Sequence, residues 1–266
     1  MSPDGVPDAS PAAMALSRKV LITLRDANIP FLVGGGYAFI RYTGIERRMK
    51  DFDVFLHERD WPGASAALNE AGIDTVLTFP HWLGKAVMDD VFVDIIYGSG
   101  NGVAPVDDEW FRHATDDEVL GVPVRLVPRE ELLWTKSFVM ERERYDGADV
   151  AHIIRVCGAD LDWRRLLGRF RENWQVLLGH LVFFGFIYPG ERALVPQEII
   201  RELLRRLDRI NSAPPSTARV CRGTLISRAQ FLVDIEEWGY LDPREAPRGG
   251  MTEEEIALWT AAIGEH

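Results

Sequence analysis

The chain has 266 residues, of which 47% are hydrophobic and 27% charged, and its formal net charge at pH 7 is −11. This composition is typical of a globular protein, and the negative charge disfavours nonspecific binding to nucleic acid or to an anionic membrane. Only Cys157 and Cys221 are present, without a CxxC or Cys/His cluster, which excludes a zinc finger and argues against a disulfide framework. No apolar run approaches the ~18 residues of a membrane span and no signal peptide is recognisable, so we expect a cytoplasmic protein.

The first half of the chain alternates between helical and strand-like patterns, which predicts an α/β (α+β) fold with helices flanking a mixed sheet. Residues 1–11 are rich in Pro, Asp and Ser, and we expect them to be disordered. The predicted elements are a helix ending near Asn28, a strand over Pro30–Val33, a turn at Gly34-Gly35-Gly36, a helix over Tyr37–Tyr42 stopped by Gly44, a strand over Asp51–Leu56, a helix from Pro62 to Ala71, a hairpin of Leu83–Met88 and Val91–Tyr97, and a strand over Val122–Val127.

The second half is predicted to be mainly helical. A helical pattern runs from Pro128 to about Cys157 with a break at Gly147, and Thr252-x-x-Glu255 is a capping box that opens a last helix. We therefore divide the chain into the disordered segment 1–11, an α/β domain over 12–157 and a helical domain over 158–266. The helices expected in the last domain are Trp163–Phe170, Trp174–Phe184 and Pro196–Ile210.

Three aspartates are the candidate metal ligands. Asp51 and Asp53 lie two apart on a predicted strand, so their side chains leave the same face, and two such carboxylates are stabilised when a cation lies between them. Asp94 is a carboxylate within the apolar run Val-Phe-Val-Asp-Ile-Ile-Tyr, where burial without a partner would cost several kcal/mol. A metal shared with Asp51 and Asp53 would supply that partner, and Lys85 across the predicted hairpin is an alternative. Oxygen ligands of this kind suit Mg²⁺ or Mn²⁺.

The residues before the aspartates are suited to binding phosphate. Backbone amides of Gly34, Gly35 and Gly36 can approach phosphate oxygens closely, and Arg48 and Lys50 add positive charge. The pattern lacks the last glycine of a dinucleotide-binding fingerprint, and the chain has no P-loop. A glycosyltransferase DxD motif is a second interpretation, although it does not account for the glycine turn.

The combined pattern resembles the signature of the DNA polymerase β-like nucleotidyltransferases, nearest the branch of antibiotic nucleotidyltransferases and AbiEii-like toxins. The shared features are the glycine turn, a short helix, Arg48-Met49-Lys50-Asp51-Phe52-Asp53, and a third acidic residue, Asp94, on a later strand. A downstream segment with Lys136, Arg142 and Asp146 is similar to the helical segment that closes the nucleotide site in the toxin-like enzymes. The resemblance covers about residues 15–157. One departure is Gly36-Tyr37-Ala38, where many members have Ser or Thr after the two glycines to contact the triphosphate.

The resemblance implies an enzyme that transfers a nucleoside monophosphate from a nucleoside triphosphate to a hydroxyl group and releases pyrophosphate. It implies that Asp51, Asp53 and Asp94 hold two Mg²⁺ or Mn²⁺ ions, and that the glycines, Arg48, Lys50 and Lys136 bind the nucleotide. The acceptor is left open between a small molecule, a transfer RNA and a protein, and a partner antitoxin is a further expectation. The alternative is a catalytically silent nucleotide-binding or interaction module of the same fold.

Other charged residues have two interpretations each. The arginines of the helical half are either solvated helix faces or a cradle for a polyanionic acceptor such as transfer RNA, whereas a cationic acceptor would seek acidic residues such as Asp107, Asp108 and Glu109. His81 and His180 each stand alone among aromatic residues, which favours packed or surface histidines over metal ligands. The arginines are Arg164, Arg165, Arg169, Arg171, Arg201, Arg205, Arg206 and Arg209.

Overall fold

A computed structural model describes residues 10–49 and 51–263, and these residues form two compact units. Unit 1 comprises the chain up to Pro128 together with the segment that begins at Met251, and unit 2 is Arg129–Gly250. The domain boundary expected at residue 157 falls inside unit 2, because the chain enters that unit at Arg129. No described helix is both long enough and apolar enough to cross a membrane.

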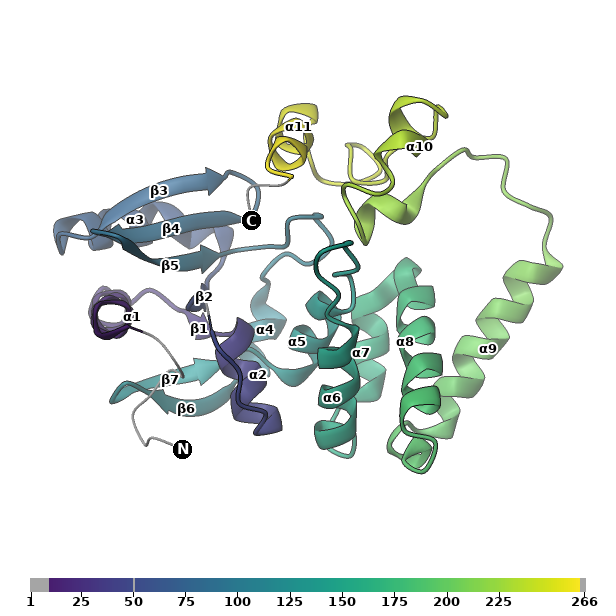
Figure 1. Ribbon diagram of the computed structural model, residues 1–266, viewed down its shortest axis with the longest axis horizontal. Helices are drawn as coiled ribbons and strands as arrows, with labels where there is room; N and C mark the ends of the chain where they lie inside the picture. The colour runs from purple at the N-terminus through teal and green to yellow at the C-terminus, as the bar shows by residue number, and fades with distance from the viewer. Residues whose placement is uncertain (1–9, 50, 264–266) are drawn as a thin grey trace. The chain divides into compact units, whose positions relative to one another are not determined.

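Unit 1 is built on a mixed sheet that has seven strands in the described residues, in the order β3-β4-β5-β2-β1-β7-β6 (Figure 1). β2 pairs parallel with β5 and β1 pairs parallel with β7, whereas the remaining neighbours are antiparallel. The predicted mixed-sheet α+β class is therefore confirmed. The strands are β1 Leu32–Val33, β2 Asp53–Phe55, β3 Asp74–Phe79, β4 Leu83–Met88, β5 Val91–Ile96, β6 Thr115–Val119 and β7 Val122–Leu126.

The helices of unit 1 begin and end where local residues dictate. In α1 the Ser10 side chain accepts a hydrogen bond from the Ala13 amide, and Pro11 occupies the first turn, where its missing N–H costs nothing. In α2 the chain turns at Gly44 with a φ of 69°, the left-handed stop that was predicted. The capping box at Thr252 and Glu255 is also confirmed. The helices are α1 Pro11–Asp26, α2 Gly35–Thr43, α3 Trp61–Glu70, α4 Asp108–Arg112 and α11 Glu253–Ala261.

The core of unit 1 lies between the sheet and its helices. The apolar face of α1 is fully buried, and it packs on β5 and α3. This apolar layer fixes β2 and β5 at the centre of the sheet, which is where the candidate carboxylates are found. The residues of that face are Leu16, Val20, Leu21 and Leu24, and they meet Val54 and Ile95 in one core cluster.

Unit 2 is mainly helical in its described residues, as the sequence predicts, with irregular segments over 213–221 and 237–250 and two isolated bridges, Met140 with Tyr145 and Val220 with Leu241. The break predicted at Gly147 within the helical pattern from Pro128 to about Cys157 is present but wider than expected, because residues 137–146 separate two helices. Its helices are α5 Arg129–Lys136, α6 Gly147–Cys157, α7 Trp163–Phe170, α8 Trp174–Ile187, α9 Gln197–Ser212 and α10 Leu232–Glu236.

Candidate functional site

The parallel pairing of β2 with β5 brings two of the three predicted carboxylates together. Asp53 is the first residue of β2, and its register partner on β5 is Asp94. The pairing extends one residue further, because the Asp94 amide donates to the carbonyl oxygen of Phe52 at 3.0 Å. Since register partners on adjacent strands project from the same face of a sheet, Asp53 and Asp94 are neighbours on one face.

The glycine turn lies directly against Asp53. The Gly34 amide donates to the Asp53 carbonyl oxygen at 3.0 Å, and α2 begins at the next residue. Gly35 has a φ of 54°, and a Cβ atom placed on it would lie 1.6 Å from Oδ2 of Asp53. Any residue with a side chain is therefore excluded there unless the Asp53 carboxylate moves. The start of α2, with its free amides, is consequently beside this carboxylate.

Asp94 has a cation beside it. Lys85 is the register partner of Asp94 on β4, and its Nζ atom lies 3.3 Å from Oδ1 of Asp94. The same Nζ atom lies 3.6 Å from the centre of the Phe92 ring, which holds the ammonium group by a cation–π contact. The sequence left two partners open for Asp94, a shared metal ion or Lys85, and the structure shows the contact with Lys85.

Asp51 differs from the expectation. It lies before β2 and is exposed, because the ladder with β5 starts at Asp53; the prediction that it shares a strand with Asp53 was wrong. Arg48 is exposed in the same segment, and Lys50 lies outside the described residues. Among the residues described, no group of three or more His, Cys, Asp or Glu side chains is arranged to hold a metal ion, so the triad stays a prediction.

Lys136 belongs to unit 2 and is buried at the end of α5. Its Nζ atom lies 3.0 Å from Oδ2 of Asp146 and 2.6 Å from Oδ2 of Asp149. Burial acts to raise the pKa of Asp146, but hydrogen bonds from Arg144 and the charge of Lys136 outweigh it and lower that pKa below its ordinary value. The charge of Lys136 is thus compensated within its own unit, and its assignment to nucleotide binding stays a prediction.

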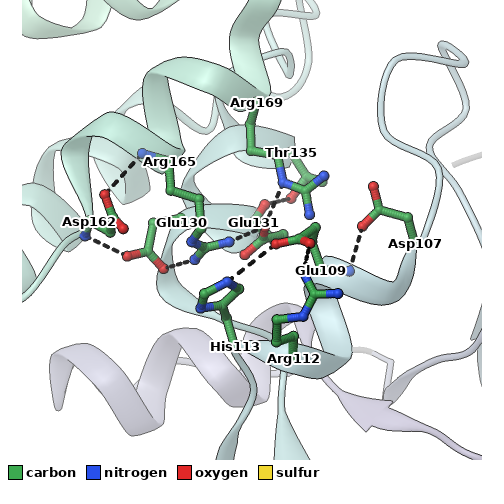
Figure 2. A network of polar contacts seen from close by, with 10 residues as sticks. All are labelled: Asp107, Glu109, Arg112, His113, Glu130, Glu131, Thr135, Asp162, Arg165 and Arg169. Atoms are coloured by element: carbon green, nitrogen blue, oxygen red, sulfur yellow. Dashed lines mark hydrogen bonds and ion pairs between the residues drawn. The ribbon is translucent and has the colours of Figure 1, made fainter.

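Two of the arginines in the helical half are largely withdrawn from solvent, with side chains 13% and 10% exposed. Arg165 and Arg169 on α7 both bond to Glu131 on α5, which has no exposed surface, and Arg165 also bonds to Glu130 (Figure 2). Neither a solvated face nor an open polyanion cradle describes these two residues. The sequence carried a signal that was missed, since Glu130 and Glu131 lie on a neighbouring predicted helix and can neutralise arginines spaced one helical turn apart.

The acidic residues proposed for a cationic acceptor are partly neutralised within unit 1. Glu109 pairs with Arg112 and His113 (Figure 2), and Oδ1 of Asp107 caps α4 by accepting from the Glu109 amide at 3.1 Å. Oδ1 of Asp108 lies 2.9 Å from Nε2 of His57.

The two isolated histidines are packed, as predicted. His180 in unit 2 is buried with its Nε2 atom 2.9 Å from the Ser137 carbonyl oxygen, and burial lowers its pKa. In unit 1, Nε2 of His81 lies 3.2 Å from the Gly100 carbonyl oxygen beside the Trp259 ring.

Comparison with known proteins gives similarities to solved structures. The antibiotic-resistance factor ANT(2″)-Ia is 19% identical with a TM-score of 0.43, over 64% of this chain and 96% of its own. The lincosamide antibiotic adenylyltransferase LnuA, with lincomycin bound, is 12% identical with a TM-score of 0.39, over 53% and 96%. A nucleotidyltransferase-like protein from Paracoccidioides brasiliensis is 16% identical with a TM-score of 0.39, over 64% and 93%. By name, these neighbours are nucleotidyltransferases or proteins like them. No family model and no curated protein matches the chain.

Proposed function

We propose that the chain is a nucleotidyltransferase that moves a nucleoside monophosphate from a nucleoside triphosphate to a hydroxyl group and releases pyrophosphate. The observation that carries this proposal is the register pairing of Asp53 with Asp94 on parallel strands, with the Gly35 backbone closed against the Asp53 carboxylate. Two adjacent carboxylates beside the start of a helix combine a place for cations with a place for phosphate oxygens.

The donor atoms fit Mg²⁺ or Mn²⁺. Asp53 and Asp94 offer carboxylate oxygens from one face of the sheet, and Asp51 lies two residues before Asp53 in the chain. These three residues would hold the ions, and the bound ions would supply charge stabilisation at the transferring phosphoryl group. The Gly34 amide is already bonded to the Asp53 carbonyl oxygen, so Gly35 and Gly36, at the start of α2, would present backbone amides to the triphosphate, with Arg48 and Lys50 adding positive charge.

The acid–base role falls to Asp94. A carboxylate at this position can accept the proton of the attacking hydroxyl, provided that it is ionised. Lys85, 3.3 Å from Oδ1 of Asp94, stabilises the ionised form. We further propose that the acceptor is a small molecule that carries a hydroxyl group, because the net charge of −11 repels a polyanion.

A second candidate function is nucleotide binding without transfer. The contact between Lys85 and Asp94 favours it, because an ammonium group at this carboxylate competes with a metal ion for the same oxygen. The replacement Lys85→Met tests this competition. If a metal ion binds at Asp94, this variant should bind Mn²⁺ several-fold more tightly in a calorimetric titration, whereas Lys19→Met, on α1, should not change the affinity.

The transfer reaction itself is tested with nucleoside triphosphates labelled at the α-phosphate. Wild-type protein, Mn²⁺ or Mg²⁺ and a panel of hydroxyl-bearing acceptors should give a labelled product and pyrophosphate only when metal is present. Nucleotide binding without product for any acceptor, including RNA and protein, would favour the silent module. Hydrolysis to a free nucleoside monophosphate in the absence of an acceptor would indicate a different phosphoryl chemistry.

A further inference from the structure

One face of α8 in unit 2 is apolar and uncovered. The helix, Trp174–Ile187, contains no Asp, Glu, Lys or Arg. Its inner side is buried against unit 2 through Leu177, Leu181 and Phe184, as expected for a core helix. On its outer side Val182 is 64% exposed, Phe183 55% and Phe186 83%. A helix that is hydrophobic all round is normally buried all round, so this outer face requires a cover.

We propose that a second copy of this chain covers this face, with the two α8 helices packed antiparallel about a two-fold axis between Val182 and Phe183. The α8 face consists of Gln175, Gly179, Val182, Phe183 and Phe186, which fall on one side of the helix at spacings of three and four residues. Two-fold symmetry makes the contact self-complementary: if a residue of the first copy contacts a given residue of the second, the reverse contact is present as well.

The shape of the face fits this register. Antiparallel packing about that axis places Phe186 of one copy opposite Gly179 of the other, and Val182 opposite Phe183. A Cβ atom built on Gly179 would meet nothing within 4 Å, so the middle of the face is open where the phenyl ring arrives. The most exposed large residue of the helix therefore meets the residue with the smallest side chain.

The charges that flank α8 fit the same arrangement. Glu172 precedes the helix and Arg192 follows it, both exposed, and neither has an ion pair among the described parts of the chain. Antiparallel packing brings Glu172 of one copy toward Arg192 of the other at both ends, whereas parallel packing would bring like charges together.

The exposed apolar area of α8 accounts for part of a dimer interface. An aromatic side chain presents ~150–250 Å², so Phe183 and Phe186 with Val182 and Ile187 expose on the order of 400 Å² of mainly apolar surface. This is about half of the ~800 Å² that each partner contributes to an interface of standard size. The remaining area would have to come from the residues that flank α8, among them Glu172 and Arg192.

Sedimentation equilibrium of the full chain tests the proposal. The wild-type protein should have twice the mass of one chain. Phe186→Glu should raise the dissociation constant at least ~30-fold, because it buries one uncompensated carboxylate from each copy within the interface. Since Phe186 is exposed, its circular dichroism spectrum should stay that of the folded protein. The matched control is Leu204→Glu on α9, which is 50% exposed and lies outside the α8 face, and it should stay dimeric.

A charge swap tests the antiparallel register. Glu172→Arg and Arg192→Glu should each weaken the dimer severalfold, and the double variant should restore it. A monomeric wild type, or a dimer that Phe186→Glu leaves intact, would overturn the proposal and leave this face to another protein or to a lipid surface. A dimer that the double variant fails to restore would overturn the antiparallel arrangement.

Discussion

Gly35 lies where only glycine fits, and the reason is a neighbouring functional group rather than the turn alone. Its φ of 54° is a left-handed conformation, and a Cβ atom would overlap the Asp53 carboxylate. Gly44, at the other end of α2, has a φ of 69° but nothing within 4 Å of the place its Cβ would occupy. A side chain at Gly44 would therefore strain only the backbone, whereas a side chain at Gly35 would strain the backbone and also overlap Asp53.

The comparison of Gly35→Ala with Gly44→Ala uses this difference. We expect Gly44→Ala to lower the free energy of unfolding by about 1 kcal/mol, from the left-handed conformation alone. Gly35→Ala should lower it further and should also weaken binding of Mg²⁺ and nucleotide, because Asp53 has to move. Urea unfolding and calorimetric titration measure the two effects. Equal behaviour of the two variants would show that Gly35 does not control the position of Asp53.

The sequence singled out Asp53 from the Asp-x-Asp pair, Asp94 as a carboxylate within an apolar run and Gly35 from the glycine turn. The structure brings these three residues together, and their role in a metal and nucleotide site stays a prediction. Asp51 was assigned to the strand because Asp-Phe-Asp-Val alternates, but strand assignment depends on pairing, and β5 offers its first partner at Asp53. The choice between a metal and Lys85 for Asp94 could not be made from the sequence, since it depends on how β4 and β5 pair.

At the scale of elements, most of the longer helices and the buried strands were predicted, but the polar strand β6 at the edge of the sheet was not. Strand β6, Thr115–Val119, includes Asp116, Asp117 and Glu118 and has no apolar alternation. It forms because it pairs with β7 at the edge of the sheet, where charged side chains reach solvent and also discourage pairing with other chains. The contact between Arg41 on α2 and Asp117 adds a link that joins segments far apart in the sequence.

The ion pairs between α5 and α7 give a prediction for stability. Glu131→Gln removes a fully buried carboxylate and leaves Arg165 and Arg169 without full compensation, and it should cost about 3–5 kcal/mol. Glu202→Gln on α9 removes solvent-screened pairs with Arg205 and Arg206 and should lower the stability much less than Glu131→Gln does. Urea denaturation of both variants provides the comparison. A loss for Glu131→Gln no larger than that for Glu202→Gln would mean that the α5–α7 pairs do not hold unit 2 together.

At the scale of the whole molecule, charge bears on the choice of acceptor. The net charge is −11, and the arginines of α9 are interspersed with acidic residues. One shallow hollow on this helix is lined by Arg201, Leu204, Arg205 and Asp208. With Arg165 and Arg169 engaged by glutamates, fewer arginines are available to a polyanion than the sequence suggested. This distribution favours a small acceptor over RNA.

Binding of transfer RNA at two salt concentrations tests this choice. For the wild type we expect no binding that weakens steeply with salt, and no difference from a variant with Arg201, Arg205 and Arg209 replaced by Glu. Fluorescence anisotropy with labelled transfer RNA is the measurement. Steeply salt-dependent binding that the triple variant loses would contradict the small-acceptor proposal and assign the α9 face to RNA.

The central claim is that Asp53 and Asp94 form a metal-dependent nucleotide site, and calorimetric titration with Mg²⁺ and α,β-methylene-ATP, which resists transfer, tests it most directly. The wild type should bind this analogue only when Mg²⁺ is present, and Asp53→Asn should weaken binding by on the order of 100-fold, or about 2.7 kcal/mol. The control Asp116→Asn, whose side chain on β6 is 95% exposed, should bind like the wild type. Metal-dependent binding by Asp53→Asn with unchanged affinity would contradict the account.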